Sequence, residues 1–274
     1  MKIYIPTFRR VDQQITFNSL PDKYKEKVVM VVQRQERDLY DYDCEYMVVD
    51  DNIGLTLTRT HIFSNNRNKR FCMVDDDVVF FRRNQKYIKE APDGYVDFKP
   101  NMVKVKTESD MDGSKRLIEF NNLFDNGDSY RPHQPIIQVS SKEQSQPPVG
   151  IRTRTNMAGK SFHFFNGVHI DKIFDDIDWN MVKVGQDSMW QLEFLLHGYQ
   201  LRLNDIFCIK SLWWQEGGVS EYRDAKMYNE EHQKLIKKYP SYCWNGNNTI
   251  KRDVIGDVID IKYRWRKAFK DGSC

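Results

Sequence analysis

The chain has 274 residues, 40% hydrophobic and 30% charged, which excludes wholesale disorder and allows a packed core. The formal net charge of +3 neither demands nor excludes a polyanionic partner. No apolar run approaches the ~20 residues of a membrane span, and the N-terminus lacks the pattern of a secretory signal. The five cysteines include no C-x-x-C pair, which favours reduced thiols over a disulfide framework or a zinc knuckle. We therefore expect a cytoplasmic protein.

The first eighty residues alternate short apolar runs with a helical pattern. Strands are predicted at 3–5, 28–32, 46–49 and 71–74, and a helix at 54–66. Strands separated by helices predict a mostly parallel central sheet with crossover connections and helices on both faces. The fold class is therefore α/β.

The pattern weakens between 94 and 160, where the polar stretch 140–148 is typical of a long loop. Regularity returns in the second half, with a largely buried helix at 187–197 and a strand at 201–209. The stretch 224–238 predicts a polar, exposed helix. Neither an internal repeat nor a domain linker is evident, so we expect one domain over the whole chain.

Polar residues follow the predicted strands at the points where they end. Pro6, Gln33, Asp50-Asp51 and Asp75-Asp76-Asp77 all occupy such positions. Ligands of parallel sheets bind beyond the carboxyl ends of the strands, and these ends meet at one edge. We therefore expect the binding site there.

Asp75-Asp76-Asp77 is the sharpest feature of the sequence. Three carboxylates at the end of a buried strand need a counter-charge, which a divalent cation such as Mg²⁺ or Mn²⁺ supplies. On an extended chain, Asp75 and Asp77 point to one side and Asp76 to the other. Asp75 and Asp77 are thus candidate metal ligands that share one ion. In a second arrangement, one carboxylate holds the metal while its neighbour, such as Asp76, holds a sugar hydroxyl. The alternative is an acidic turn that caps the next element.

The order of motifs resembles the nucleotide-binding half of GT-A glycosyltransferases, a Rossmann-like single-domain family with an Asp-x-Asp motif. The resemblance rests on Ile5-Pro6-Thr7-Phe8-Arg9-Arg10, Asp51-Asn52-Ile53-Gly54 with Thr58-Arg59, and Met73-Val74-Asp75-Asp76-Asp77. It implies a nucleotide-sugar donor and a divalent metal.

By this resemblance, the donor would contact Pro6, Thr7, Arg9, Gln33, Asp51, Arg59, Asp75, Asp76 and Arg223. Gln33 would approach the base, and Arg59 the diphosphate. Arg9 and Arg59 have a plainer alternative as surface charges on a loop and on an exposed helix face.

The second half carries two further matches. Phe164-Phe165-Asn166-Gly167-Val168 resembles a segment that borders the acceptor, and Asp187 stands where inverting members carry their catalytic base, although Gln186 replaces a common acidic residue. An Asp there is able to take the proton of the acceptor hydroxyl. The alternative is a carboxylate that complements the helix dipole.

A loop around Gly217-Gly218 resembles a segment that closes over the donor, with Arg223 for phosphate. Relatives place a further metal ligand in this region, often a His. No His lies between 210 and 223. Gln215 or Glu216 is able to substitute, with Glu216 as the candidate third ligand, and water is the alternative.

The C-terminal stretch 261–270 has five basic residues, three aromatics and no acidic residue. This composition suits a nucleic-acid backbone with bases to stack on. It equally suits a basic amphipathic helix on the core, or contact with an anionic membrane.

The chain also resembles bacteriophage GT-A enzymes, among them T-even-like enzymes that glycosylate hydroxymethylcytosine or glucosyl-hydroxymethylcytosine in DNA. This implies UDP-glucose as donor, double-stranded DNA bearing modified cytosine as acceptor, and the host cytoplasm as location. The expected parts are a donor half (1–90), an acceptor and catalytic half (161–240) and a basic aromatic segment (250–274). No obligate protein partner is indicated.

Three alternatives remain open at this level. One is a glycosyltransferase acting on a cell-envelope polysaccharide or another glycan. The second is a metal-dependent nucleotidyltransferase or phosphohydrolase, although the loop after the first strand has no glycine. The third is a non-catalytic nucleic-acid-binding protein on an enzyme fold.

Overall fold

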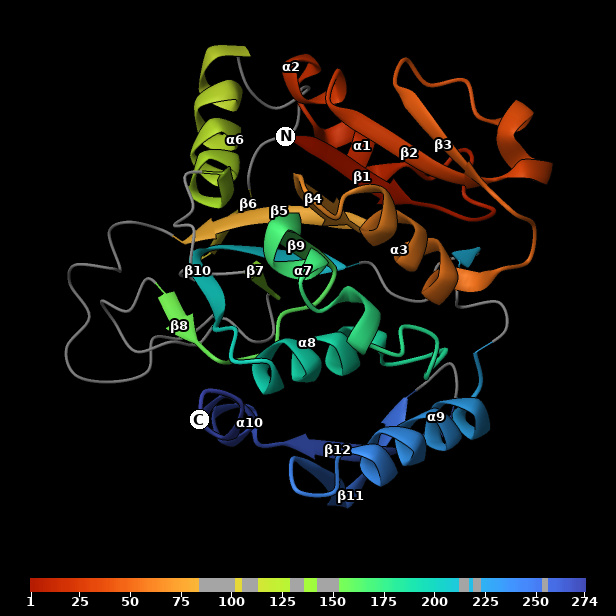
Figure 1. Cartoon of the computed structure of the whole chain (residues 1–274). Coiled ribbons are helices and arrows are strands. Elements are labelled where there is room, and N and C mark those ends of the chain that lie inside the picture. Colours follow the sequence, from red (N-terminus) through yellow and green to blue (C-terminus); the bar gives the residue numbers. More distant parts are fainter. Residues whose placement is uncertain are drawn as a thin grey trace.

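The computed structural model describes residues 1–83, 102–104, 113–128, 136–141, 153–211, 217–218, 223–252 and 256–274. Figure 1 shows a central sheet with helices above and below it. No helix within these ranges is long and apolar enough to cross a membrane.

The strands of the main sheet are β1 (Lys2–Pro6), β2 (Val28–Gln33), β3 (Glu45–Val49), β4 (Arg70–Val74), β5 (Val78–Arg83), β6 (Met102–Lys104), β7 (Ile136–Ser141), β8 (Thr153–Thr155), β9 (Phe162–Asn166) and β10 (Leu201–Ser211). A separate hairpin joins β11 (Cys243–Arg252) to β12 (Gly256–Tyr263).

The helices are α1 (Ile15–Ser19), α2 (Asp22–Lys25), α3 (Gly54–Asn65), α6 (Gly113–Asp128), α7 (Gly167–Asp171), α8 (Gln186–Leu196), α9 (Ala225–Lys238) and α10 (Trp265–Gly272). Short 3-10 turns, η1 (Arg34–Leu39) and η4 (Phe174–Asp176), complete the elements of the described ranges.

The main sheet has the strand order β3-β2-β1-β4-β9-β7-β10-β5-β6, with β8 paired to β10. The four N-terminal strands β3, β2, β1 and β4 are mutually parallel. Beyond β4 the pairing is mixed, since β9 runs antiparallel to both β4 and β7, whereas β7 and β10 are parallel. The predicted α/β class and the parallel first half are confirmed.

Side-chain alternation in the strands gives the sheet two apolar faces. In β1, Ile3 and Ile5 pack on one face and Tyr4 on the other, as the period of two in a strand requires. The first face is covered by α1, α2 and α6, and the second by α3 and α8. The sheet is therefore buried on both sides, as expected of parallel strands.

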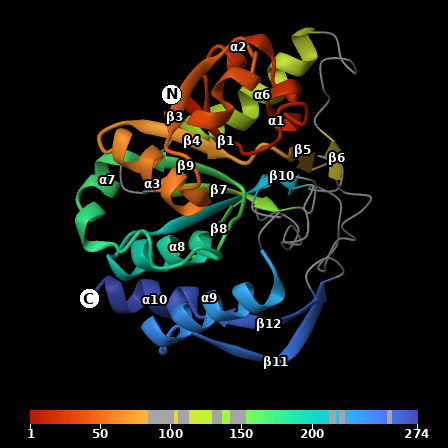
Figure 2. The ribbon, with the colours of Figure 1, turned by 90° about the vertical axis from the view of Figure 1, so that its right-hand side faces the viewer.

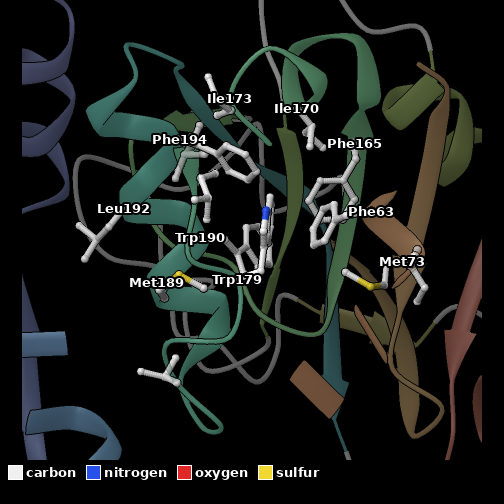
Figure 3. Close-up of a cluster of buried hydrophobic side chains, with 14 of the residues drawn as sticks. Phe63, Met73, Phe165, Ile170, Ile173, Trp179, Met189, Trp190, Leu192 and Phe194 are labelled. Carbon is white, nitrogen blue, oxygen red and sulfur yellow. The ribbon is translucent and has the colours of Figure 1, made fainter. Parts of the chain in front are cut away.

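The core on the α3 and α8 side is rich in aromatic rings. Trp190 of α8 is 1% exposed and packs against Phe63 of α3 and Phe165 of β9, with ring centroids 5.9 and 5.3 Å away (Figure 3). Trp179 lies closer still to Phe63, with ring centroids 4.6 Å apart and an interplanar angle of 33°. These contacts fix α3 and α8 against the same strands, and both helices carry predicted site residues.

Helix α6 lies within 94–160, a region whose weak pattern predicted no helix. Within α6, Phe120, Leu123 and Phe124 are buried and pack under β9. Their spacing of three and four residues is a helical signal. The predicted loop at 140–148 begins inside β7, which ends at Ser141, and residues 142–148 lie outside the described ranges.

The C-terminal elements form a layer of their own. Figures 1 and 2 both place α9, the β11–β12 hairpin and α10 on the far side of α8 from the sheet. The join between α10 and α8 is close, because a Cβ at Gly272 would lie 2.3 Å from the Leu195 carbonyl oxygen. The basic aromatic stretch 261–270 is thus the end of β12 followed by an amphipathic helix.

Candidate active site

One cavity of about 930 Å³ lies at the predicted edge of the sheet. Its lining includes the ends of the parallel strands, at Pro6, Gln33, Val49 and Asp75. On the opposite side it is closed by α9, β12 and the start of α10. The strand ends therefore meet the C-terminal layer across one continuous space.

Arg10 is the centre of one ion-pair cluster in this cavity. Its Nη1 donates to Asp76 Oδ1 at 2.5 Å and lies 3.4 Å from Asp77 Oδ2. Asp76 also accepts from the Thr7 hydroxyl at 2.7 Å, and Asp77 accepts from the Ser211 hydroxyl at 2.7 Å. Both carboxylates and Arg10 are buried, so the cluster holds the loop after β1 to the turn after β4.

Arg59 of α3 is the centre of the second cluster. Its Nη2 donates to Asp75 Oδ1 at 2.7 Å, and its Nη1 donates to Asp187 Oδ1 at 2.6 Å. The guanidinium also donates to Gln186 Oε1 at 2.9 Å. The side chain of Arg59 is 6% exposed, against 25% for Asp75 and 21% for Asp187. Two partly open carboxylates from distant parts of the chain thus share one buried cation.

Burial and charge act against each other on these groups. Burial raises the pKa of Asp76 to about 7, although Arg10 and the Thr7 hydroxyl favour the ionised form. Burial also raises the pKa of Asp77, and the neighbouring charge of Asp75 adds to this. For Arg59, burial alone would lower the pKa, but Asp187 and Asp75 outweigh it and raise the pKa.

The predicted alternation of the three aspartates is wrong. β4 ends at Val74, and Asp76-Asp77 form a turn before β5, so the period of two in an extended strand does not apply. Asp76 and Asp77 share Arg10, whereas Asp75 pairs with Arg59.

The other predicted donor residues fall into two groups. Gln33 lines the cavity, and its Oε1 accepts from the backbone N–H of Asn52 at 2.8 Å. Arg9 and Asp51 are exposed and are not among the cavity-lining residues. Asp51 accepts from the Gln35 backbone N–H at 2.8 Å, and the Arg9 guanidinium lies over the Phe8 ring. Of the two neighbouring arginines, Arg10 enters the site, whereas the resemblance implied a donor contact by Arg9.

The late loop is described only in part. Glu216 lies outside the described residues. The backbone at Gly217-Gly218 packs against the loop after β1, with the Gly218 N–H donating to the Phe8 carbonyl at 2.8 Å. Both glycines have positive φ, 81° and 65°, which other residues rarely adopt. Arg223 lines the cavity next to Tyr228.

The segment 164–168, which comprises the end of β9 and the start of α7, does not border the cavity, contrary to the expectation. Because β9 is antiparallel to β4, Asn166 pairs with Arg70 at the start of β4, at the opposite edge of the sheet. Residues at the other end of β9, Lys160 and Ser161, line the cavity instead. Strand direction is a property of the tertiary structure, and local pattern does not give it.

Residues 1–110 match a family model described as TET-Associated Glycosyltransferase. The matched region contains the loop after β1, α3 with Arg59, and all three aspartates of the turn after β4. The chain is a glycosyltransferase. A comparison with curated proteins gives no significant match.

Solved structures with similar folds include two enzymes with nucleotide ligands. One is a CMP:2-keto-3-deoxy-manno-octonic acid synthetase complexed with CTP, at 10% identity and a TM-score of 0.38, covering 74% of this chain and 88% of that one. The other is a UDP-glucose pyrophosphorylase complexed with UDP-glucose, at 11% identity and a TM-score of 0.36, covering 86% and 98%. At this level of similarity they have no bearing on the reaction.

Proposed function

We propose that this protein is an inverting glycosyltransferase that moves glucose from UDP-glucose to a modified cytosine in phage DNA. The main support for this reaction is the ion-pair cluster around Arg59. It holds Asp75, at the end of the donor-side strand β4, and Asp187, at the start of α8, against one guanidinium inside one cavity.

The donor would occupy the side of the cavity formed by the strand ends. Pro6 ends β1, Thr7 follows it, and Gln33 ends β2, so these residues would border the nucleotide. Arg59 and Arg223 supply positive charge for the diphosphate, since both line the cavity. Guanidinium groups suit this role because their planar donors match phosphate oxygens.

The carboxylates fit a divalent cation. Among the described residues no cluster of three His, Cys, Asp or Glu side chains is arranged to hold a metal ion. Mg²⁺ needs fewer protein ligands, because one or two carboxylates plus substrate phosphates suffice. Asp75, which is partly open to the cavity, would be the main ligand, with Asp77 beside it and Glu216 as a further candidate. A bound Mg²⁺ or Mn²⁺ would neutralise charge on the leaving diphosphate.

Asp187 would act as the general base. As the acceptor hydroxyl attacks the sugar C1, its proton passes to the Asp187 carboxylate, the new C1–O bond forms, and the bond to the diphosphate breaks. A single displacement inverts the configuration at C1. Arg59 keeps Asp187 in place through the 2.6 Å contact, and Gln186 completes the same hydrogen-bond network.

The acceptor is proposed from the family description and the surface charge. TET association points to modified cytosine. On the C-terminal layer, Arg264, Arg266 and Lys270 are exposed beside the cavity wall, where they would contact DNA phosphates. Phosphate contacts position a protein on DNA, and recognition of the modified base is left to the cavity.

The first experiment is UDP release from UDP-glucose with Mg²⁺ or Mn²⁺, in the presence of plain DNA, hydroxymethylcytosine DNA or glucosyl-hydroxymethylcytosine DNA. We expect release that depends on one of the modified DNAs and stops when EDTA is added. Slow UDP release that no DNA stimulates would be consistent with a glycosyltransferase but would exclude modified cytosine as the acceptor. Release from no nucleotide sugar would refute the proposal.

Two variants separate the roles in the same assay. Asp187→Asn is expected to bind UDP normally and to lower transfer about 100-fold or more, the range of general base catalysis. Asp75→Ala is expected to lower both metal-dependent UDP binding and transfer. Normal transfer by Asp187→Asn would show that the base is another residue.

A further inference from the structure

The cavity is larger than its donor side, and its outer wall has no role in the proposed reaction. This wall combines Tyr228 and His232 of α9 with Ile259, Ile261 and Tyr263 of β12. Trp265, the first residue of α10, completes it. The volume of the whole cavity, about 930 Å³, lies near the upper end of the ~300–1,000 Å³ typical of small-molecule sites. The space beyond the donor is therefore large enough for a second ring.

The wall is aromatic where it meets the reaction centre. Tyr263 and Trp265 are stacked, with ring centroids 4.5 Å apart and an interplanar angle of 17°. The Tyr263 side chain lies next to that of Ser188, which directly follows Asp187. The stacked pair therefore lies beside the first turn of α8, where the proposed base is located.

The packing holds this pair in a fixed position. Tyr263 and Trp265 both pack against the core that contains α8, and both remain partly exposed. A Cβ at Gly272 would lie 2.3 and 2.4 Å from the carbonyl oxygens of Leu195 and Leu196, so α10 docks closely against the end of α8. A rigid aromatic face requires little ordering when a ligand binds.

We infer that the Tyr263–Trp265 pair is the acceptor subsite, and that it takes the planar heterocycle of the acceptor base by stacking. This inference rests on the proposed function, and it names the residues that would bind the acceptor in that reaction. Asp187 is only 21% exposed, within a cavity, so an acceptor hydroxyl reaches it only if its ring enters the cavity as well. Exposed Arg264 and Arg266 flank Trp265 in sequence, where they would hold the adjoining phosphates outside.

The chain offers a matched control on the β11–β12 hairpin, which directly precedes α10. Trp244 of β11 is 38% exposed, lies under the Arg264 guanidinium at 4.7 Å and is not among the cavity-lining residues. A general contribution of surface tryptophans to DNA binding would make Trp244 and Trp265 equivalent. Only a subsite inside the cavity would make the effect of replacing Trp265 differ from the effect of replacing Trp244.

The test compares wild type, Trp265→Ala, Trp265→Phe and Trp244→Ala. Transfer rates would be measured against the concentration of hydroxymethylcytosine duplex and of free 5-hydroxymethyl-2′-deoxycytidine. UDP binding by calorimetry would report that the donor side is intact. Trp265→Ala should raise the acceptor KM for both acceptors between about 5-fold and about 150-fold, the effect of one stacked base. Trp265→Phe should recover most of this loss.

The outcomes distinguish a wrong subsite assignment from a wrong proposed function. If wild type transfers to modified cytosine but Trp265→Ala leaves both acceptor KM values unchanged, the subsite assignment is wrong and the proposed function stands. An equal rise in Trp244→Ala would also overturn the assignment. If wild type transfers to no modified cytosine, the proposed function fails and the subsite fails with it.

Discussion

At the scale of single residues, the site depends on two buried arginines. Arg10 and Arg59 each hold two carboxylates, and the four acids come from two separate parts of the chain. Removing one partner of a buried ion pair typically costs about 3–5 kcal/mol, because the other charge is left uncompensated. Variants of these arginines would therefore lose stability as well as activity. Asp187 is partly exposed, so a variant of Asp187 tests the catalytic role with a smaller effect on stability.

His163 gives a prediction for pH. It is 2% exposed on β9, its ring nitrogens have no hydrogen-bond partner within the described structure, and burial followed by the charge of Arg59 lowers its pKa to about 3. The unfolded chain binds a proton at His163 near pH 6.5, whereas the folded chain stays neutral down to about pH 3. This contribution to stability is therefore complete above pH 6.5 and is lost as the pH falls toward 3.

The measurement is urea unfolding of wild type and His163→Phe at pH 5.0 and pH 7.5. Wild type should lose more stability than the variant between these values, by up to about 1.4 kcal/mol per pH unit below 6.5. An identical pH dependence in the two proteins would mean that His163 is protonated or solvated in the folded state.

At the scale of elements, close backbone contacts fix how the second half docks on the first. Gly167 begins α7, and its N–H donates to the Lys69 carbonyl at 2.9 Å. A Cβ at this position would lie 1.9 Å from the Asn66 carbonyl oxygen. The glycine is needed for space, because the turn that follows α3 passes directly over it.

Gly167→Ala is therefore expected to lower the free energy of unfolding by about 1–3 kcal/mol or more, as overpacking does. The control is Val168→Ala at the next position, where the side chain is 48% exposed and the expected change is within about 0.5 kcal/mol. Denaturant midpoints of the two variants report the difference. Equal midpoints would show that the turn after α3 moves freely away from α7.

At the scale of the whole molecule, the charge distribution matters more than the net charge of +3. Arg266 and Lys270 are exposed on α10, next to the cavity wall, whereas Lys267 is paired with Asp271. Lys23 of α2 and Lys27, which directly precedes β2, lie toward the starts of the parallel strands, opposite the cavity. Positive charge near the cavity is thus the part expected to contact DNA.

Arg266→Ala with Lys270→Ala should weaken duplex DNA binding and reduce the slope of log affinity against log salt by about 1.8, as the loss of two phosphate contacts requires. The control is Lys23→Ala with Lys27→Ala, which removes the same charge from the far edge. Fluorescence anisotropy at several salt concentrations measures both slopes. The same reduction in both double variants would point to non-specific attraction over the whole surface.

The sequence alone determined the elements whose pattern is local. The four parallel strands, α3, α8 and α9 were predicted nearly to the residue, because apolar periodicity and strand-end polar residues are set by neighbours in the chain. The sequence also indicated the edge of the sheet where Asp75 and Gln33 lie, since parallel strands end together. The helix α6 was missed, although Phe120 and Phe124 carried the signal.

Only the tertiary structure decided which polar groups meet. It buries Arg10 and leaves its neighbour Arg9 exposed, and it brings Arg59 to Asp187, 128 positions further along the chain. It also turns a basic aromatic tail into the wall of the same cavity that contains the strand ends. Burial and long-range pairing depend on how strands and helices pack against each other, and no local spacing of residues carries that information.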